Sequence, residues 1–334
     1  MVDRSTFTIS VVGAGLMGHG ITQEFAQHGF RVNIFESDTI QRGTVRRRIE
    51  TNLNLLAAQG VIPPEDVAAT LSRVRVFDAL ETAVAEADLV VEAVFEDLEL
   101  KQSIFRQLDE MCPPEVILAS NSSSFTPSQY AKGTSRPERI VGTHYFNPPY
   151  LVPLVEVVRG EAAAEETAEK TASLLRDIGK KVAIVRKESP GFIANRIQVA
   201  LFREAFNVVE QGIATPEEVD LAIKNSFGRR LGIMGPFEQS DIIGADLKLS
   251  IYNALVPHIS HSREPSPLLE EKVRKGELGM KTGRGFYPWT EQSIQAMNER
   301  LRKWLVGVNR LEADLLSSSS TTEEGKPEDE GEEG

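Results

Sequence analysis

The stretch FTISVVGAGLMGHGITQEFAQHGFRVNIFES, residues 7–37, joins a β-branched run, a glycine-rich turn, an amphipathic helical pattern and a second apolar run. Strand, turn, helix and strand in this order are typical of a dinucleotide-binding unit. Each glycine of the G-x-G-x-x-G pattern has a physical task. Gly13 makes the tight turn, Gly15 lets the backbone approach a pyrophosphate, and Gly18 lets the helix pack closely on the strand. The helix N-terminus then offers free N–H groups to the anion.

An acidic residue closes the second strand of this unit. Glu36 follows Gly13 by 23 residues, and a carboxylate there accepts hydrogen bonds from ribose hydroxyls and repels a 2′-phosphate. The next two residues are Ser37 and Asp38, so no arginine stands beside Glu36 to bind the 2′-phosphate of NADP. We therefore expect the cofactor to be NAD rather than NADP. The alternative is that the glycines form a purely structural turn and that Glu36 is an exposed acid without a ligand.

Further strand patterns extend the unit into a Rossmann-type doubly wound α/β sheet, interrupted by a helical hairpin over residues 44–74. In such a sheet, ligands bind beyond the carboxyl ends of the strands. Glu96 follows the fourth predicted strand, and a serine-rich turn that includes Ser123 follows the fifth. We expect both at the site, although a serine-rich turn can also be a helix N-cap. After the first two strands, we expect strands at residues 74–78, 87–94 and 116–121. Two more are expected within residues 139–160, and a last one at residues 181–187.

The segment RIVGTHYFNPPYLVPLVEVVRG, residues 139–160, reads as two strands joined by a proline turn. His144 and Glu156 are equally distant from Tyr150 in the sequence, so the two side chains should meet if the strands fold back on each other. An imidazole held by a buried carboxylate is suited to act as a general base. The segment therefore predicts a proton-accepting pair.

The strand patterns stop after Gly191, and helical spacing takes over, including one helix expected over 235–255. We predict a dinucleotide-binding domain over 1–188, an all-α domain over 189–316 and a disordered acidic tail over 317–334. The tail lacks large apolar residues and carries seven acids and one lysine, about half of the net charge of −12.

Composition excludes several classes of protein. The acidic balance argues against nucleic-acid binding, and no apolar run is long enough to span a membrane. Cys112 is the single cysteine, which excludes an intramolecular disulfide and a cysteine-rich metal site. With no secretory signal pattern, we expect a cytoplasmic protein without a metal centre.

Six motifs in order resemble the 3-hydroxyacyl-CoA dehydrogenase family: GAGLMGHGI, SNSSS, HYFNPP with LVEVV, SPGFIANR, GPFEQSDIIG and KTGRGFY. The resemblance implies NAD-dependent oxidation of a 3-hydroxyl group, with His144 as catalytic base and Glu156 as its partner. It also implies that Ser123 and Asn195 contact the substrate and that the helical half forms a homodimer. The cofactor-binding residues it supports, together with the glycine motif, are Gly13, Gly15, Leu16, Met17, Gly18, Glu36, Glu96, Lys101, Ser123, Asn147 and Lys281.

Two departures leave the substrate open between a CoA thioester and a free acid. In acyl-CoA members of the family the helical hairpin carries lysines that meet the CoA phosphates, whereas residues 50–60 here contain none. The turn Pro148-Pro149-Tyr150 is similar to branches that oxidise free hydroxy acids, such as L-gulonate 3-dehydrogenase, the λ-crystallin relative. An L-3-hydroxyacyl-CoA is the first expectation, and a free L-gulonate-like or carnitine-like 3-hydroxy acid is the alternative. A non-catalytic NAD-binding structural protein is a third interpretation.

Overall fold

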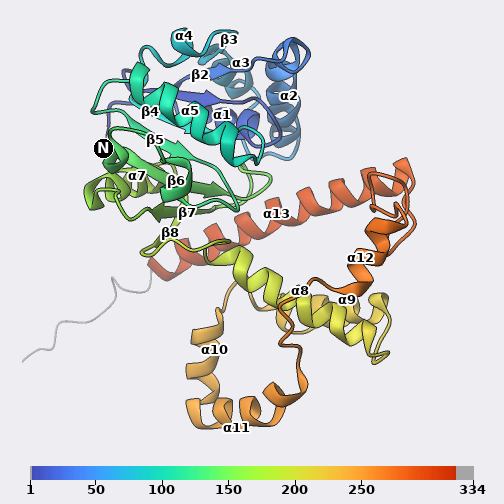
Figure 1. The fold of residues 1–334 in the computed structure, drawn as a ribbon. Coiled ribbons are helices and arrows are strands. Elements are labelled where there is room, and N and C mark those ends of the chain that lie inside the picture. Colours follow the sequence, from blue (N-terminus) through green and yellow to red (C-terminus); the bar gives the residue numbers. More distant parts are fainter. Residues whose placement is uncertain (1, 321–334) are drawn as a thin grey trace, which may run out of the picture. The chain divides into compact units, whose positions relative to one another are not determined.

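The computed structural model describes residues 2–320, with side chains as far as residue 315 (Figure 1). Packing divides the chain into two compact units. The first contains Met1–Ile193 and the residues from Leu301 onward, and the second contains Ala194–Arg300. The expected fold class is confirmed, because a doubly wound sheet with an inserted helical hairpin precedes a helical region.

The sheet of the first unit has eight strands within residues 2–320, in the order β3-β2-β1-β4-β5-β6-β7-β8. The first six run parallel, whereas β7 is antiparallel to β6 and β8 runs parallel to β7. Every strand that the sequence predicts is present. They are β1 (Thr8–Val12), β2 (Arg31–Phe35), β3 (Val74–Phe77), β4 (Leu89–Glu92), β5 (Ile117–Ser120), β6 (Ile140–Tyr145), β7 (Leu154–Arg159) and β8 (Lys181–Val185).

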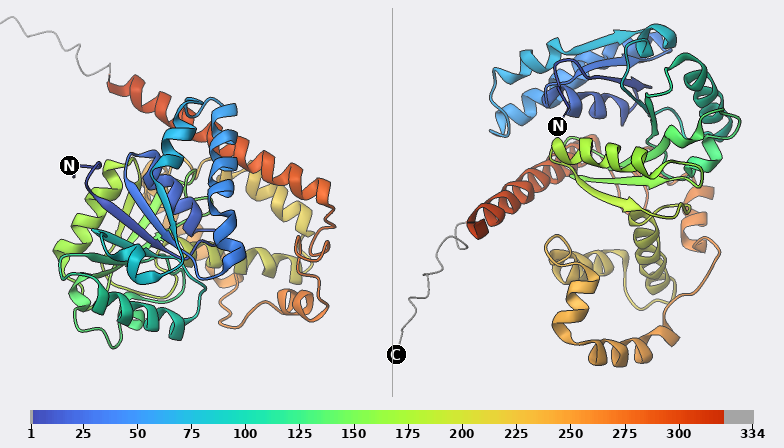
Figure 2. Two further views of the ribbon diagram at one scale, coloured as in Figure 1. Left: turned by 90° about the horizontal axis from the view of Figure 1, so that it is seen from above. Right: turned by 90° about the vertical axis from the view of Figure 1, so that its left-hand side faces the viewer.

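Helices cover both faces of this twisted sheet (Figure 2). Side chains alternate between the faces, so that Val11 of β1 belongs to one buried cluster and Val12 to the other. The first cluster is completed by α1 (Gly18–Gln27), α2 (Thr39–Ala58) and α7 (Glu165–Asp177). The second is completed by α4 (Leu80–Val84), α5 (Leu98–Met111) and α6 (Pro127–Tyr130).

The predicted helical hairpin consists of α2 and α3 (Asp66–Ser72). Helix α2 begins five residues before the expected position, because the Asp38 side chain caps it by accepting a hydrogen bond from Gln41 N at 2.7 Å. The apolar side of α2 packs into the first cluster through Val45, Ile49 and Leu53.

The second unit is helical, with α8 (Ala194–Glu210), α9 (Pro216–Asn225), α10 (Pro236–Ile243), α11 (Ala245–Leu255) and α12 (Pro267–Arg274). The prediction of one continuous helix over residues 235–255 is wrong. Gly244 has a φ of 90°, a left-handed conformation that ends α10 and starts α11. Between Ala194 and Arg300, no hydrophobic side chain is fully buried within the chain.

Helix α13 (Glu291–Ser320) begins in the second unit and ends in the first. Val306 is buried against Leu56 of α2 and Leu151. The Asn309 side chain also donates a hydrogen bond to Leu151 O at 2.8 Å. Residues 301–315 therefore pack with the sheet unit, whereas the predicted domain boundaries assign them to the helical domain. The predicted disordered tail, 317–334, lies outside the described residues from residue 321 onward.

Candidate active site

A cavity of about 600 Å³ opens at the carboxyl ends of β1, β2, β4 and β5. This is the edge of a doubly wound sheet at which nucleotides bind. Most of the cofactor-binding residues that the sequence predicts within the first unit line it. They are Gly13, Gly15, Leu16, Met17, Glu36, Glu96 and Ser123.

The three glycines of the turn have different surroundings. Gly13 has a φ of 98°, and a Cβ atom there would lie 2.8 Å from the carbonyl oxygen of Ala93. A Cβ atom on Gly18 would lie 1.8 Å from Gly13 O, whereas Gly15 has no neighbour within 4 Å of such an atom. Gly13 and Gly18 therefore shape the turn, and Gly15 leaves the space that a pyrophosphate needs.

Glu36 lies at the end of β2 and braces the glycine turn. Its carboxylate accepts hydrogen bonds from Ala14 N at 2.8 Å and from Asp38 N at 3.0 Å. The Arg42 guanidinium donates to the backbone carbonyls of Glu36 and Ser37. This arrangement fits the adenosine ribose of NAD, because the carboxylate is fixed at the cavity wall.

A cluster of charges contacts the serine-rich loop; Glu92 and Lys101 are buried, whereas Glu96 is exposed. Glu96 Oε1 accepts hydrogen bonds from Ser122 Oγ at 2.6 Å, Ser123 N at 3.0 Å and Ser124 N at 2.8 Å. Burial alone would raise the pKa of Glu96, but the hydrogen bond from Ser122 and the charge of Lys101 lower it. Glu96 is therefore the group that holds this loop at the cavity.

Lys101 is only 1% exposed and lies under the cavity wall rather than on it. Its ammonium group pairs with Glu92 at 2.9 Å and with Glu96 at 3.2 Å. Glu92 also accepts a hydrogen bond from Ser120 Oγ at 2.6 Å. Sequence reasoning missed Glu92, although an acid inside the apolar strand LVVE is an available signal.

His144 and Glu156 face each other across β6 and β7, as the sequence predicts. The Nδ1–H of His144 donates to Glu156 Oε2 at 2.7 Å, and both residues are buried. The second carboxylate oxygen accepts from Ile193 N at 2.9 Å. The imidazole ring lies between Phe146 and Phe192, at 4.5 and 5.5 Å between ring centroids. A carboxylate on Nδ1 leaves Nε2 as the nitrogen that can accept a proton.

Asn121 connects the serine-rich loop to the strand of this histidine. Its side-chain oxygen accepts a hydrogen bond from Tyr145 N at 3.0 Å, and Asn121 also lines the cavity. Asn147 is exposed two residues after the end of β6, before a cis peptide bond to Pro148. The hairpin and the cofactor cavity are therefore linked through Asn121, a residue to which the sequence alone gave no role.

The remaining predicted site residues belong to the second unit. Asn195 lies in the first turn of α8, and Lys281 lies in an exposed turn after α12. Their assignment to the site stays a prediction. Among the residues described, no cluster of three or more His, Cys, Asp or Glu could hold a metal ion. No helix in that same part of the chain is long and apolar enough to cross a membrane.

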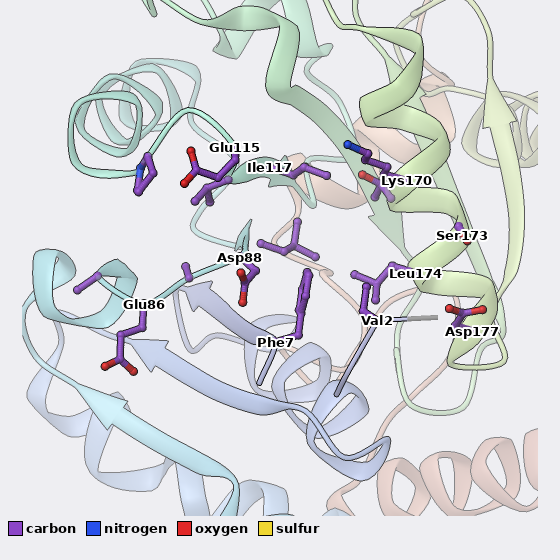
Figure 3. Close-up of a pocket in the computed structure, with 16 residues that line it drawn as sticks. Val2, Phe7, Glu86, Asp88, Glu115, Ile117, Lys170, Ser173, Leu174 and Asp177 are labelled. Carbon is purple, nitrogen blue, oxygen red and sulfur yellow. The ribbon is translucent and has the colours of Figure 1, made fainter. Parts of the chain in front are cut away.

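A second cavity of about 590 Å³ opens at the amino ends of β1, β4 and β5 (Figure 3). Phe7 and Ile117 are among the apolar residues that line it, and Glu86, Asp88 and Lys170 are among the charged ones. None of the predicted site residues lines it. Its position at the edge opposite to the glycine turn separates it from the cofactor site.

Comparison with known proteins identifies the family. The family models described as the NAD-binding domain and the C-terminal domain of 3-hydroxyacyl-CoA dehydrogenase match residues 8–189 and 191–289. The chain belongs to the 3-hydroxyacyl-CoA dehydrogenase family. It is therefore an NAD-dependent oxidoreductase that acts on a CH–OH group, which excludes a purely structural protein.

Relatives of this dehydrogenase fall into two groups by the substrates in their names. A probable 3-hydroxybutyryl-CoA dehydrogenase of Bacillus subtilis is 38% identical over 85% of this chain and 98% of its own length. A 5-formyl-3-hydroxy-2-methylpyridine 4-carboxylate 5-dehydrogenase of Mesorhizobium japonicum is 33% identical over 91% of this chain and 97% of its own.

Solved structures show the same two groups. The structure of a 5-formyl-3-hydroxy-2-methylpyridine 4-carboxylic acid 5-dehydrogenase, an NAD⁺-dependent dismutase, has a TM-score of 0.85 at 31% identity. It covers 91% of this chain and 97% of its own. A (S)-3-hydroxybutyryl-CoA dehydrogenase from Ralstonia eutropha has a TM-score of 0.72 at 33% identity, over 86% of this chain and 100% of its own.

Proposed function

We propose that the enzyme oxidises the 3-hydroxyl group of an L-3-hydroxyacyl-CoA, such as 3-hydroxybutyryl-CoA, to the 3-oxo product. The observation that carries this proposal is the buried His144–Glu156 pair, with 2.7 Å between Nδ1 and Oε2. Several relatives named as 3-hydroxybutyryl-CoA dehydrogenases support the substrate class.

In the proposed mechanism His144 takes the hydroxyl proton on Nε2, and Glu156 stabilises the imidazolium that forms. The glycine turn and Glu36 would hold NAD, which would supply the acceptor for the hydride of C3. Ser123 and Asn195 are the substrate contacts that the family resemblance implies. Glu96 keeps the serine-rich loop in place through the three hydrogen bonds to its carboxylate.

The first test is a His144→Gln variant. We expect kcat to fall by at least ~10², while NAD affinity, measured by fluorescence titration, stays nearly unchanged because the glycine turn is intact. Near-normal turnover in this variant would remove His144 as the base. A His261→Gln variant, in which an exposed histidine of the second unit is replaced, is the matched control and should behave as wild type.

A free 3-hydroxy acid is the second candidate substrate, and the structure of α2 favours it. Residues 50–60 supply no lysine for CoA phosphates, and α13 covers this end of α2. Arg310 of α13 donates a hydrogen bond to Gln59 O, and Val306 packs on Leu56. The structure of the dehydrogenase that acts on a free pyridine carboxylate also has a higher TM-score than that of the Ralstonia eutropha acyl-CoA enzyme, 0.85 against 0.72.

Steady-state assays decide between the two candidates. NADH oxidation is followed with acetoacetyl-CoA and with a panel of free 3-oxo acids. A kcat/KM for acetoacetyl-CoA at least ~10²-fold above that of every free acid supports the thioester, since ~2.7 kcal/mol of binding energy would then come from CoA. Comparable or better turnover of a free acid would reject it.

We further propose that the enzyme is a homodimer formed through the second unit. Its helices expose large apolar side chains, among them Phe237, Ile242 and Leu247 at 86, 72 and 52% exposure. Exposed apolar surface of this extent is typical of a protein interface. Sedimentation velocity should give one species of twice the chain mass, and a monomer at micromolar concentration would contradict the proposal.

A further inference from the structure

A buried ion pair lies outside the cofactor cavity and has no part in the proposed chemistry. Glu24 of α1 and Lys180, just before β8, are 3.0 Å apart, with side chains 8 and 5% exposed. Burying two charges costs free energy unless they are paired and hydrogen-bonded. The other contacts of this pair therefore indicate what it does for the fold.

Those contacts reach the turn between the two strands of the catalytic pair. Lys180 Nζ donates to Pro149 O at 2.6 Å and lies 3.5 Å from Val152 O. Both carbonyls belong to the segment that separates His144 from Glu156. A charged donor makes such hydrogen bonds stronger than those between neutral groups. Lys180 thus ties α1, through Glu24, to the catalytic hairpin.

The same turn also touches α1 directly. A Cβ atom on Gly20 would lie only 2.6 Å from Pro149 Cγ and 3.6 Å from Tyr150 Cδ1. Gly20 is two residues beyond Gly18 of the dinucleotide motif. The absence of a side chain therefore lets the cofactor-binding helix and the catalytic turn come into contact.

Tyr145 provides a third link between these elements. It follows His144 on β6 and packs in the same buried cluster as Ile21 and Phe25 of α1. Burial, together with the negative charge of Glu24, raises the pKa of the Tyr145 hydroxyl well above its usual value. The strand that carries the base and the helix that follows the glycine turn thus share one interior.

We propose that Glu24, Lys180 and Gly20 are positioning residues that fix His144 relative to the bound cofactor. Helix α1 sets the place of NAD through its N-terminus, and the hairpin sets the place of the base. Hydride and proton must leave neighbouring atoms of one substrate, so the relative placement of the two elements governs the rate. A displacement of about 1 Å can cost ~10² in rate. This inference rests on the proposed role of His144.

The test compares Lys180→Met with the double variant Glu24→Gln/Lys180→Met and with Gly20→Ala. Lys180→Met leaves the charge of Glu24 buried without its partner, which can prevent folding. The double variant removes both charges, so it tests the inference even if the single variant does not fold. Gly20→Ala retains all charges and displaces only Pro149. Lys170→Met is the control, since Lys170 forms an exposed pair with Glu166 at 2.8 Å.

The readouts are kcat, the KM for NAD and the deuterium isotope effect on kcat with substrate labelled at C3. The substrate is whichever compound of the assay panel wild type turns over best. We expect kcat to fall by ~10-fold or more in the double and Gly20→Ala variants, with an increased isotope effect and a KM for NAD within about twofold. Loss of stability alone would lower the active fraction but would not raise the isotope effect.

Two outcomes would overturn the inference. One is a folded double variant whose kcat and isotope effect equal those of wild type. The other is a fall in kcat without any change in the isotope effect. Failure of the proposed function is distinguishable, because it would appear as normal turnover in His144→Gln whatever these variants do.

Discussion

Replacing Glu156 by glutamine tests the buried pair at the centre of the proposed mechanism. Glutamine keeps the shape of the side chain, and its amide oxygen can still accept from His144 Nδ1. The negative charge is lost from a site where Glu156 is 0% exposed, and the amide nitrogen cannot accept the hydrogen bond from Ile193 N. The glycine turn is left unchanged, so the variant tests how far the charge of Glu156 stabilises the imidazolium.

The expected magnitude follows from the geometry. With Nδ1 and Oε2 2.7 Å apart, the two charge centres are separated by a few ångströms. At ~4 Å and an effective dielectric constant of ~20, the attraction is ~4 kcal/mol for a fully formed imidazolium. A half-developed charge in the transition state gives ~2 kcal/mol, so kcat should fall by between ~30-fold and ~10³-fold.

Initial rates of NADH formation at saturating substrate measure this effect, and fluorescence titration checks that NAD affinity is retained. Glu166→Gln, at an exposed helix pair with Lys170, is the matched control and should leave kcat unchanged. A kcat for Glu156→Gln within about threefold of wild type would refute the reasoning, because less than ~0.7 kcal/mol would then come from the carboxylate.

Three further changes have expected outcomes. Glu36→Ala should raise the Kd for NAD, measured by titration, because the ribose acceptor and the brace at Ala14 N are both lost. Gly13→Ala should lower the melting temperature, since the new Cβ would lie 2.8 Å from Ala93 O at a φ of 98°. Burial would raise the pKa of Asp109, but hydrogen bonds from Ser135 and the charge of Arg139 lower it to about 2. The resulting ~2 kcal/mol of stability is present above the unfolded pKa of ~3.9 and is lost as pH falls through 2. Urea unfolding between pH 5 and 2 should therefore show a shallower pH dependence in Asp109→Asn.

Much of the fold was predictable because its signals are local. The glycine turn and the β-branched runs specify the βαβ unit within a few dozen residues. The meeting of His144 and Glu156 was also predictable, since equal spacing from Tyr150 fixes which residues pair across a tight hairpin. Here the sequence pattern and the observed register agree.

Other features depend on contacts between distant residues, which no local pattern encodes. Glu24 and Lys180 are 156 positions apart, and nothing in either segment indicates that both charges are buried together. Lys101 was expected to contact the cofactor, and nothing in its local sequence indicates that it is 1% exposed and paired with Glu92 and Glu96. The break at Gly244 was missed because one glycine within a helical apolar pattern does not reveal its φ value.

Helix α13 has a consequence for the order of folding. Its residues from Leu301 onward pack with the sheet unit, so the 107 residues of Ala194–Arg300 are an insertion within that unit. Translation at ~5–20 residues per second needs ~5–20 s to produce the insertion. During that time Leu56 and Leu151 lack the apolar cover of Val306. The last segment of the sheet unit is thus synthesised after the helical unit. Folding of the sheet unit during synthesis can be completed only once α13 has left the ribosome.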